Sequence, residues 1–332
     1  MCEALIPTHV TSRPQIDTPD RLEPAPVLPA GGPGEPPRYA EARRAGEAAI
    51  REGRVAAFTV AGGQGTRLGF DGPKGAFRIS PIRNAPLFQL FAEQLRGTAR
   101  RFGRLPRWYV MTSPLNDDET RAFFEEHAYF GLPRDEVVFF RQRQMAVFLP
   151  DGRIALSEKH RVALSPDGHG GSLRALAESG ALEDMRARGI DYISYFQVDN
   201  PLVRAIDPLF VGLHVVEKSE MSSKAVTKAD DLERVGNFCL ADGKLTVIEY
   251  SDMPESLARA KNPDGSRRFD AGSIAIHILN REFVERMTSA DSAIRLPWHR
   301  ADKKVPVVDD AGRKVVPDGP NVVKLEMFVF DA

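Results

Sequence analysis

The sequence predicts an α/β fold with a doubly wound, mostly parallel sheet, helices on both faces and an added mixed β region. The first indication is that short apolar, β-prone runs alternate with helix-length segments over the first two thirds of the chain. That order is typical of parallel strands joined by crossing helices. The second is a change from about residue 224, where short strands separated by turns follow one another. We interpret this last part as an extension of the sheet.

The elements of the first two thirds follow from composition and apolar spacing. Residues 1–38 are rich in proline and glycine and are expected to form a flexible tail. Residues 39–52, rich in alanine, arginine and glutamate, predict a helix, and apolar residues recurring at helical spacing predict another from about 85 to 102. Further helices are expected over 117–127 and 173–188, and buried strands over 55–60, 108–112, 137–140 and 192–198.

The last third predicts short strands joined by turns. These are expected over 224–226, 236–240, 245–250 and 273–278. Ala241-Asp242-Gly243-Lys244 is a favourable hairpin connection between two of them.

Composition limits the function classes. The 332 residues can bury a substantial core. Their 45 basic and 46 acidic side chains give a net charge of −1, which indicates no nucleic-acid surface and no polybasic membrane patch. Two cysteines, Cys2 and Cys239, cannot build a disulfide framework, and no spacing suggests a zinc site. Without an apolar run long enough for a bilayer or a signal-peptide pattern, we expect a cytoplasmic protein with no membrane partner.

The loop after the first buried strand carries the strongest functional signal. It reads Ala61-Gly62-Gly63-Gln64-Gly65-Thr66-Arg67-Leu68-Gly69, and Pro73-Lys74-Gly75 follows. Glycines at 62, 63 and 65 are expected to allow positive φ and close approach of a phosphate, while consecutive N–H groups form an anion-binding concavity. Arg67 and Lys74 add positive charge, and arginine can bind phosphate oxygens bidentately. The loop therefore predicts a polyphosphate site.

Two familiar phosphate loops do not fit this sequence. The P-loop requires Lys-Ser or Lys-Thr at a fixed distance from its glycines, and none is present. The dinucleotide fingerprint fails because Leu68 stands where its third glycine is required. A purely structural glycine turn is the remaining alternative, and the order of residues in this loop is too elaborate for it.

A second candidate is Asp199, which follows the strand predicted at 192–198. Ligands of open α/β sheets bind at the carboxyl ends of strands, and Mg²⁺ prefers carboxylate oxygens. Gly62, Gln142 and Asp199 all lie just past such ends, so we expect them around one crevice. The alternative for Asp199-Asn200 is a turn or a helix cap.

With this loop, the sequence resembles the eukaryotic-type UDP-sugar pyrophosphorylases, and most of all the UDP-N-acetylglucosamine pyrophosphorylase family. The resemblance covers about residues 40–332. Besides the loop, it is carried in order by Phe130-Gly131-Leu132, Phe139-Phe140-Arg141-Gln142, Ser165-Pro166-Asp167-Gly168-His169-Gly170-Gly171, Val198-Asp199-Asn200, Val235-Gly236, Glu249-Tyr250-Ser251, Asp270-Ala271-Gly272 and residues 324–331.

The resemblance implies a Rossmann-like sheet of the nucleotide-diphospho-sugar transferase type. It implies a UTP-binding half over 39–223 and a sugar-binding half over 224–332. The implied activity is that of a UTP:sugar-1-phosphate uridylyltransferase, which uses Mg²⁺ and forms pyrophosphate and UDP-N-acetylglucosamine or a related UDP-hexose. Such a transfer requires in-line positioning and neutralised charge rather than a covalent nucleophile.

The resemblance also implies a role for each candidate residue. Catalytic charge would come from Arg67, Lys74 and Lys324, and Asp199 would hold Mg²⁺. The nucleotide would meet Ala61, Gly62, Gly63, Gly65, Thr66, Gln142, Pro166, Asp167, Gly168 and His169. The sugar would meet Asn200, Gly236, Glu249 and Asp270. The side-chain amide of Gln142 can match both a donor and an acceptor of uracil. Without the resemblance, Gln142, Glu249 and Lys324 are ordinary polar positions.

Three residues and the chain length depart from the family pattern. Asp270 replaces an asparagine and, when ionised, can only accept hydrogen bonds. His169 replaces another asparagine and is expected to titrate near neutral pH. Arg141 replaces a glutamine and is expected to add charge beside the base pocket. The chain ends at Ala332 where the family continues, so its C-terminal domain, with a further phosphate-binding lysine, is expected to be absent.

Three functions therefore stay open, as do the identity of the sugar and the oligomeric state. The uridylyltransferase is favoured because Arg67 and Lys74 suit a leaving pyrophosphate. A non-catalytic protein that binds UTP or a UDP-sugar would use the same loop without turnover. A glycosyltransferase that uses a finished UDP-sugar would share the metal carboxylate but leaves those two cations unexplained.

Overall fold

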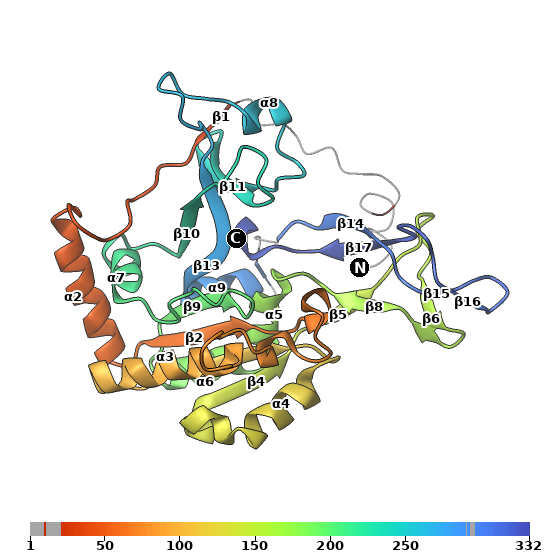
Figure 1. Cartoon of the computed structure of the whole chain (residues 1–332), viewed down its shortest axis with the longest axis horizontal. Helices are drawn as coiled ribbons and strands as arrows, with labels where there is room; N and C mark the ends of the chain where they lie inside the picture. The colour runs from red at the N-terminus through yellow and green to blue at the C-terminus, as the bar shows by residue number, and fades with distance from the viewer. Residues whose placement is uncertain (1–9, 11–20, 290, 293–295) are drawn as a thin grey trace. The chain divides into compact units, whose positions relative to one another are not determined.

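The computed structural model describes residue 10 and residues 21–289, 291–292 and 296–332 (Figure 1). The chain forms two compact units. We call Pro19–Arg141 with Leu176–Ser292 the sheet unit, and Met1–Thr18, Gln142–Ala175 and Ala293–Ala332 the hairpin unit. Within the described ranges, no helix combines the length and apolar character needed to cross a membrane.

The sheet unit contains one nine-stranded mixed sheet, whose order is β1-β11-β13-β9-β2-β3-β4, with β10 paired to β13 and β12 to β11. Strands β9, β2, β3 and β4 run parallel, and the other pairings are antiparallel. Its strands are β1 (Leu22–Pro24), β2 (Val55–Val60), β3 (Trp108–Thr112), β4 (Val137–Arg141), β9 (Tyr192–Gln197), β10 (Met221–Thr227), β11 (Gly236–Ala241), β12 (Lys244–Ile248) and β13 (Ala271–Asn280).

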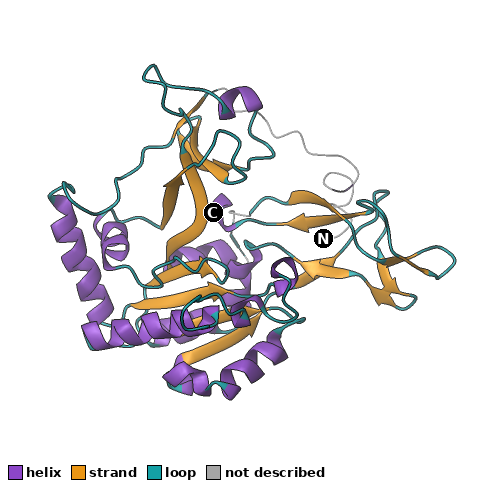
Figure 2. Cartoon of the chain, in the orientation of Figure 1, coloured by secondary structure: helices purple, strands orange, loops and turns teal. Residues whose placement is uncertain are grey.

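Helices separate most of the strands, which gives a mixed α/β fold (Figure 2). They are α2 (Arg38–Arg51), α3 (Leu87–Phe102), α4 (Asp117–Glu126), α5 (Gly171–Glu178), α6 (Ala181–Ala187), α7 (Pro208–Val216), α8 (Glu255–Ala258) and α9 (Arg281–Thr288). Helix α3 ends as its sequence predicts, because Gly103 takes a left-handed conformation and its N–H donates to the Ala99 carbonyl.

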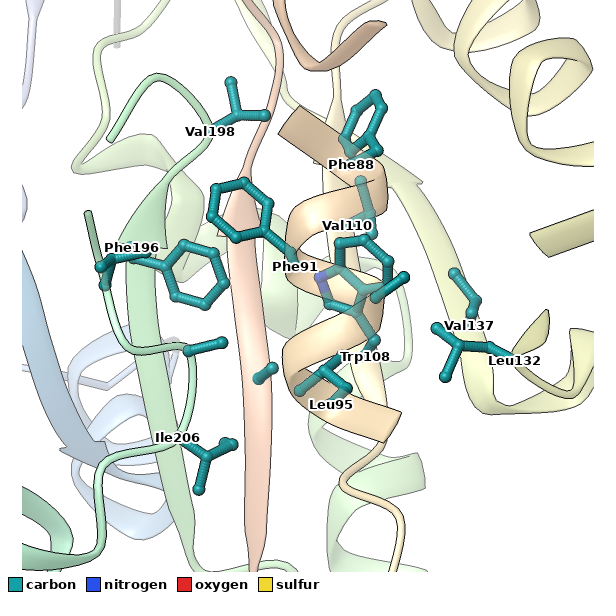
Figure 3. Packing of buried hydrophobic residues seen from close by; sticks show 14 of the residues in the cluster. Phe88, Phe91, Leu95, Trp108, Val110, Leu132, Val137, Phe196, Val198 and Ile206 are labelled. Carbon is teal, nitrogen blue, oxygen red and sulfur yellow. The ribbon is translucent and has the colours of Figure 1, made fainter. Parts of the chain in front are cut away.

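Aromatic side chains pack the parallel strands against helix α3 (Figure 3). Phe91 of α3 and Phe196 of β9 lie with ring centroids 5.1 Å apart, and Phe88 meets Trp108 of β3 at 6.3 Å. The Trp108 indole N–H donates to Thr59 Oγ1, so this buried polar group is satisfied. This core fixes the carboxyl ends of β2, β3 and β9.

The hairpin unit is built from four short antiparallel pairs. Two small apolar clusters hold them, one around Val147 and Val322 and the other around Phe148 and Val323. The pairs are β5 (Gln144–Ala146) with β8 (Leu164–Pro166), β6 (Leu156–Glu158) with β7 (Arg161–Val162), β14 (His299–Lys303) with β17 (Val322–Glu326), and β15 (Val307–Val308) with β16 (Lys314–Val315).

The elements predicted in the sheet unit are confirmed, with two corrections. The helix expected over 173–188 is broken into α5 and α6, because Gly180 has φ 81° and cannot continue the helix. The tail expected over 1–38 is wrong for Leu22–Pro24, which pair with β11 because that strand offers a free edge and Leu22 packs in an apolar cluster. Apart from Val10, residues 1–20 lie outside the described residues. The hairpin at Asp242-Gly243 is confirmed, and both residues have positive φ.

Candidate functional site

The loop after β2 is held in the sheet unit by hydrogen bonds to its neighbours. Ala61 N donates to Met111 O at 2.7 Å, and the Asn116 amide donates to Ala61 O at 2.9 Å. Across the loop, Lys74 N donates to Gly63 O at 3.1 Å, and Gly65 N donates to Gly72 O at 2.8 Å. The loop is therefore built into the end of the sheet.

These bonds decide which amides can meet an anion. The N–H groups of Ala61, Gly65 and Lys74 are already used. Those of Gly62 and Gly63 donate to no acceptor among the described residues. The Gln64 N–H likewise donates to no described acceptor, so three successive amides, those of Gly62, Gly63 and Gln64, remain as the anion-binding concavity.

The expected positive φ at Gly62, Gly63 and Gly65 is wrong. The left-handed glycines of the loop are Gly69 (φ 67°) and Gly72 (φ 147°), where the chain turns back. Gly65 is required for space, because a Cβ there would lie 2.7 Å from the Phe70 ring. Gly63 faces the Lys74 side chain, whose nearest atom would lie 3.5 Å from an added Cβ.

Asp199 and Lys74 meet at the carboxyl ends of β9 and β2. These strands are parallel neighbours, with Gln197 opposite Val60. Lys74 Nζ lies 2.7 Å from Asp199 Oδ2, and the two side chains are 20% and 42% exposed. The turn alternative is confirmed for the backbone, because Asn200 N donates to Gln197 O at 3.2 Å around Val198 and Asp199, and Asn200 Oδ1 accepts from Leu202 N at 3.2 Å. The Asp199 side chain nevertheless presents a partly solvated carboxylate beside the loop.

Arg67 is the second predicted cation of the loop, and its side chain is exposed. Among the described residues it makes no ion pair or side-chain hydrogen bond, so its guanidinium can bind an incoming anion. Thr66 precedes it in the same turn, Gly65–Leu68.

The residues of this site fit a magnesium ion that arrives with a phosphate ligand. No group of three or more His, Cys, Asp or Glu side chains within the described ranges could hold a metal by itself. Mg²⁺ usually takes one or two carboxylates and completes its shell with water and substrate phosphates. Asp199 can supply such a carboxylate once Lys74 releases it.

In the hairpin unit, Gln142 is buried against the turn that follows β8. Its Nε2 donates to Asp167 Oδ1 at 3.0 Å and to Gly168 O at 2.6 Å. Because a carboxylate and a carbonyl can only accept, both amide hydrogens face inward. Only the acceptor Oε1 of Gln142 is therefore left for a nucleobase. The sequence predicted that the Gln142 amide would both donate to and accept from uracil, and in this arrangement it can only accept. Pro166 belongs to β8 and pairs with Gln144.

His169 lies next in this turn and does not titrate where the sequence suggested. Its Nδ1 accepts from Val329 N at 3.1 Å, and its ring stacks on Phe328. Burial, followed by the nearby His299, lowers the pKa of His169 to about 4. The expected titration near neutral pH is therefore wrong, and the imidazole is a neutral acceptor.

Three of the four predicted sugar residues, Gly236, Glu249 and Asp270, lie in the antiparallel part of the sheet unit, whereas Asn200 lies just past β9. Gly236 begins β11, and a Cβ there would lie 3.3 Å from Glu249 Oε1, so these two positions adjoin. Asp270 Oδ1 accepts from Arg267 Nε at 2.6 Å and from Lys228 N at 3.3 Å. The Asp270 carboxylate is thus paired with a cation, which the sequence did not indicate.

Two further predictions concern charges. Arg141 ends β4, and its guanidinium contacts Asp117 Oδ2 at 2.7 Å and Asp118 Oδ1 at 2.9 Å. The expectation of added charge beside the base pocket is wrong, because helix α4 neutralises this arginine. Lys324 lies on β17, where burial lowers its pKa. It belongs to the hairpin unit, and its assignment to the phosphates stays a prediction.

Sequence reasoning missed Asn116 and Arg267. Asn116 follows β3, so the strand-end rule that selected Asp199 could have found it. Arg267 contacts Asp270 from a loop whose conformation no local pattern indicates.

The fold and the loop place the chain in a class of α/β proteins that is represented among solved structures. UDP-N-acetylglucosamine pyrophosphorylase from Trypanosoma brucei, solved with an inhibitor, is similar with a TM-score of 0.76 and 32% identity, over 89% of this chain and 58% of that one. UDP-glucose pyrophosphorylase from Leishmania major shares the fold at 18% identity, with a TM-score of 0.70 over 93% of this chain and 64% of that one.

Sequence comparison then gives the family. The family model described as UTP–glucose-1-phosphate uridylyltransferase matches residues 40–328, and the chain belongs to this family. It is 41% identical to UDP-N-acetylhexosamine pyrophosphorylase-like protein 1 of Xenopus tropicalis, over 94% of this chain and 62% of the relative. It is 38% identical to UDP-N-acetylglucosamine pyrophosphorylase of Saccharomyces cerevisiae, over 87% of this chain and 61% of the relative. The chain thus spans less than two thirds of these relatives.

Proposed function

We propose that the protein is a UTP:sugar-1-phosphate uridylyltransferase that forms UDP-N-acetylglucosamine or a related UDP-hexose. The observation that carries the proposal is the meeting of Lys74 and Asp199, 2.7 Å apart, beside the glycine loop. This arrangement supplies a cation for phosphate and a carboxylate for Mg²⁺. The names of two relatives, UDP-N-acetylhexosamine pyrophosphorylase-like protein 1 and UDP-N-acetylglucosamine pyrophosphorylase, support it.

In the proposed reaction a phosphate oxygen of the sugar 1-phosphate attacks the α-phosphorus of UTP. A new P–O bond forms, the bond from the α-phosphorus to its bridging oxygen breaks, and pyrophosphate leaves with that oxygen. The Gly62 and Gly63 amides and Arg67 hold the triphosphate and offset charge on the leaving group. A bound Mg²⁺ would supply further neutralisation of phosphate oxygens.

Binding requires an exchange of partners at the Lys74–Asp199 pair. Asp199 would hold Mg²⁺, and Lys74, without its carboxylate partner, would then be free for a phosphate oxygen. Both groups are partly exposed, so this exchange costs little in the ligand-free protein.

The remaining assignments are part of the same proposal. Gln142 Oε1 accepts the N3–H of uracil, with Pro166 and Asp167 of the same unit around the base. Residues 39–223, with a doubly wound sheet, bind the nucleotide, and residues 224–332 bind the sugar. The enzyme is cytoplasmic in this proposal. At the sugar, Gly236 leaves room for the ligand, Glu249 accepts from its hydroxyl groups, and Asn200 lies alongside.

Pyrophosphate release tests the proposal. The protein is incubated with UTP, Mg²⁺ and a panel of sugar 1-phosphates, and UDP-sugar is quantified. We expect turnover with at least one hexose phosphate and a loss of about 10²–10³-fold in Arg67→Ala or Asp199→Ala. Unchanged activity in these two variants would refute the assigned roles.

A non-catalytic UTP-binding or UDP-sugar-binding protein is the second candidate. Such a protein would use the same glycine loop, with the free Gly62 and Gly63 amides, without turnover. Calorimetry with UTP and UDP-N-acetylglucosamine separates the two, because binding without turnover on any sugar phosphate supports this second function.

A further inference from the structure

The segment Met327–Asp331 is hydrogen-bonded along the turn Asp167–Gly171 of the hairpin unit. We call the first the C-terminal clasp and the second the base turn. Met327 N donates to Asp167 O at 2.8 Å, and Gly170 N donates to Met327 O at 2.8 Å. Val329 N donates to His169 Nδ1 at 3.1 Å. This contact pairs three N–H donors with three acceptors. Without it, these groups would be left to form hydrogen bonds with water.

The glycines of the base turn make this contact possible. A Cβ at Gly168 would lie 2.3 Å from Met327 O, and one at Gly170 would lie 2.7 Å from the carbonyl carbon of Met327. Gly168 also has φ 85°, which disfavours any other residue. The two backbones therefore approach more closely than side chains would allow.

Aromatic rings close the contact from the side. The His169 ring stacks on Phe328 with centroids 5.1 Å apart and lies 5.4 Å from Phe330. His299 packs 4.5 Å from Phe328 and contacts Asp331 Oδ2 through Nε2 at 2.8 Å. Val329 is fully buried. A neutral imidazole is required here, because a protonated Nδ1 could not accept from Val329.

The base turn also orients the side chain of Gln142. The two acceptors that hold the Gln142 amide, Asp167 Oδ1 and Gly168 O, belong to residues that the clasp contacts directly. A shift of Asp167 and Gly168 would release both amide hydrogens of Gln142. The direction of Oε1 therefore depends on a segment about 160 positions away from the base turn in the sequence.

We propose that His169 is a positioning residue for the nucleobase site: it fastens the base turn to the C-terminal clasp and thereby fixes the direction of Gln142 Oε1. The inference rests on the proposed function, since it assigns the base to Gln142. The contribution of His169 is the acceptor Nδ1 and the ring that stacks on Phe328.

Two substitutions at His169 test the proposal. His169→Asn keeps an acceptor at the δ position, whereas His169→Leu keeps apolar bulk and removes the acceptor. His160→Leu is the matched control, because His160 is in the same unit with a side chain 80% exposed. Binding of UTP, CTP and inorganic triphosphate to each full-length variant is measured by calorimetry. Triphosphate reports on the phosphate loop alone.

We expect His169→Leu to weaken UTP binding about tenfold and to reduce the preference for UTP over CTP, while its affinity for triphosphate is unchanged. His169→Asn and His160→Leu should stay within about threefold of the wild type. Equal UTP affinity and equal base preference in His169→Leu and the wild type would overturn the proposal.

Amide hydrogen exchange gives a readout that needs no nucleotide. Protection of the Val329 and Gly170 amides should fall in His169→Leu and persist in His169→Asn. Unchanged protection in His169→Leu contradicts the clasp. If His169→Leu does not fold, Phe328→Leu removes the stacking partner and is expected to lose the same protection. A wild type that binds triphosphate without preference for UTP refutes the proposed base site, and the exchange experiment still decides whether His169 fastens the turn.

Discussion

The phosphate loop and the base turn are both glycine-rich, and they are held in different ways. The loop is fixed by backbone hydrogen bonds within itself and to β3 and by the Asn116 amide, and the active groups beside it, Arg67 and Asp199, are exposed. The base turn is fixed by the clasp, and its active group, Gln142, is buried. A local motif is therefore sufficient where the sheet supports the loop, whereas a turn on short hairpins depends on distant residues.

The largest difference should appear in stability. Phe88→Ala removes a fully buried ring of the sheet core and should lower the free energy of unfolding by roughly 3–5 kcal/mol. Phe328→Ala removes a part-buried ring of the clasp and should cost less, since fewer buried atoms are lost. Urea denaturation followed by circular dichroism measures both. Equal losses would remove the proposed contrast between the two regions.

Acid should affect the clasp through His169. The pKa of His169 is lowered to about 4 in the folded protein, against about 6.5 when unfolded. The stabilisation is therefore fully present above pH 6.5 and is lost as the pH falls from 6.5 towards 4. The wild type should lose roughly 1–3 kcal/mol over this range relative to His169→Asn.

Thermal unfolding of both proteins at pH 7.5, 6, 5 and 4 measures this difference. Burial also lowers the pKa of His214, but His214 is present in both proteins and cancels from the comparison. Parallel curves for the wild type and His169→Asn would show that the His169 imidazole is not buried as described.

A smaller effect is expected at the Lys74–Asp199 pair. Lys74→Met removes the cation that competes for the carboxylate, so Mn²⁺ binding without nucleotide should tighten about two- to fivefold. Electron paramagnetic resonance of free Mn²⁺ measures this affinity. Lys304→Met, an exposed lysine of the hairpin unit, is the control for overall charge. Weaker Mn²⁺ binding in Lys74→Met would contradict the proposed exchange of partners.

The smallest effect is expected at Arg141, which is 52% exposed and bound to helix α4. Arg141→Gln should change the free energy of unfolding by about 1 kcal/mol or less, because Asp117 keeps Arg121 as a partner. UTP affinity by calorimetry should stay the same. A clear change in UTP affinity would contradict this expectation and indicate that the Arg141 guanidinium lies beside the nucleotide.

The sheet and the loop could be predicted because their information is local. Val55–Val60 and Tyr192–Gln197 are mostly apolar, β-prone runs, and the charged residues of the loop follow the first of them. The hairpin unit escaped prediction because its strands have two to five residues, too few to show an alternation.

The partners of site residues escaped prediction for a related reason. The pairs His169–Val329, Arg141–Asp117 and Arg267–Asp270 depend on where the chain returns and on which direction a side chain takes. Residue type alone indicated a titrating histidine and a free arginine. Burial and ion pairing changed both conclusions.

Pyrophosphate release is the most direct measurement of the central claim, that the loop after β2 and Asp199 together bind and activate a nucleoside triphosphate. With UTP, Mg²⁺ and N-acetylglucosamine 1-phosphate or another hexose 1-phosphate, we expect one pyrophosphate per UDP-sugar, and almost none in Asp199→Ala. Release that continues undiminished in Asp199→Ala, or a wild type that neither binds UTP nor releases pyrophosphate, would contradict it.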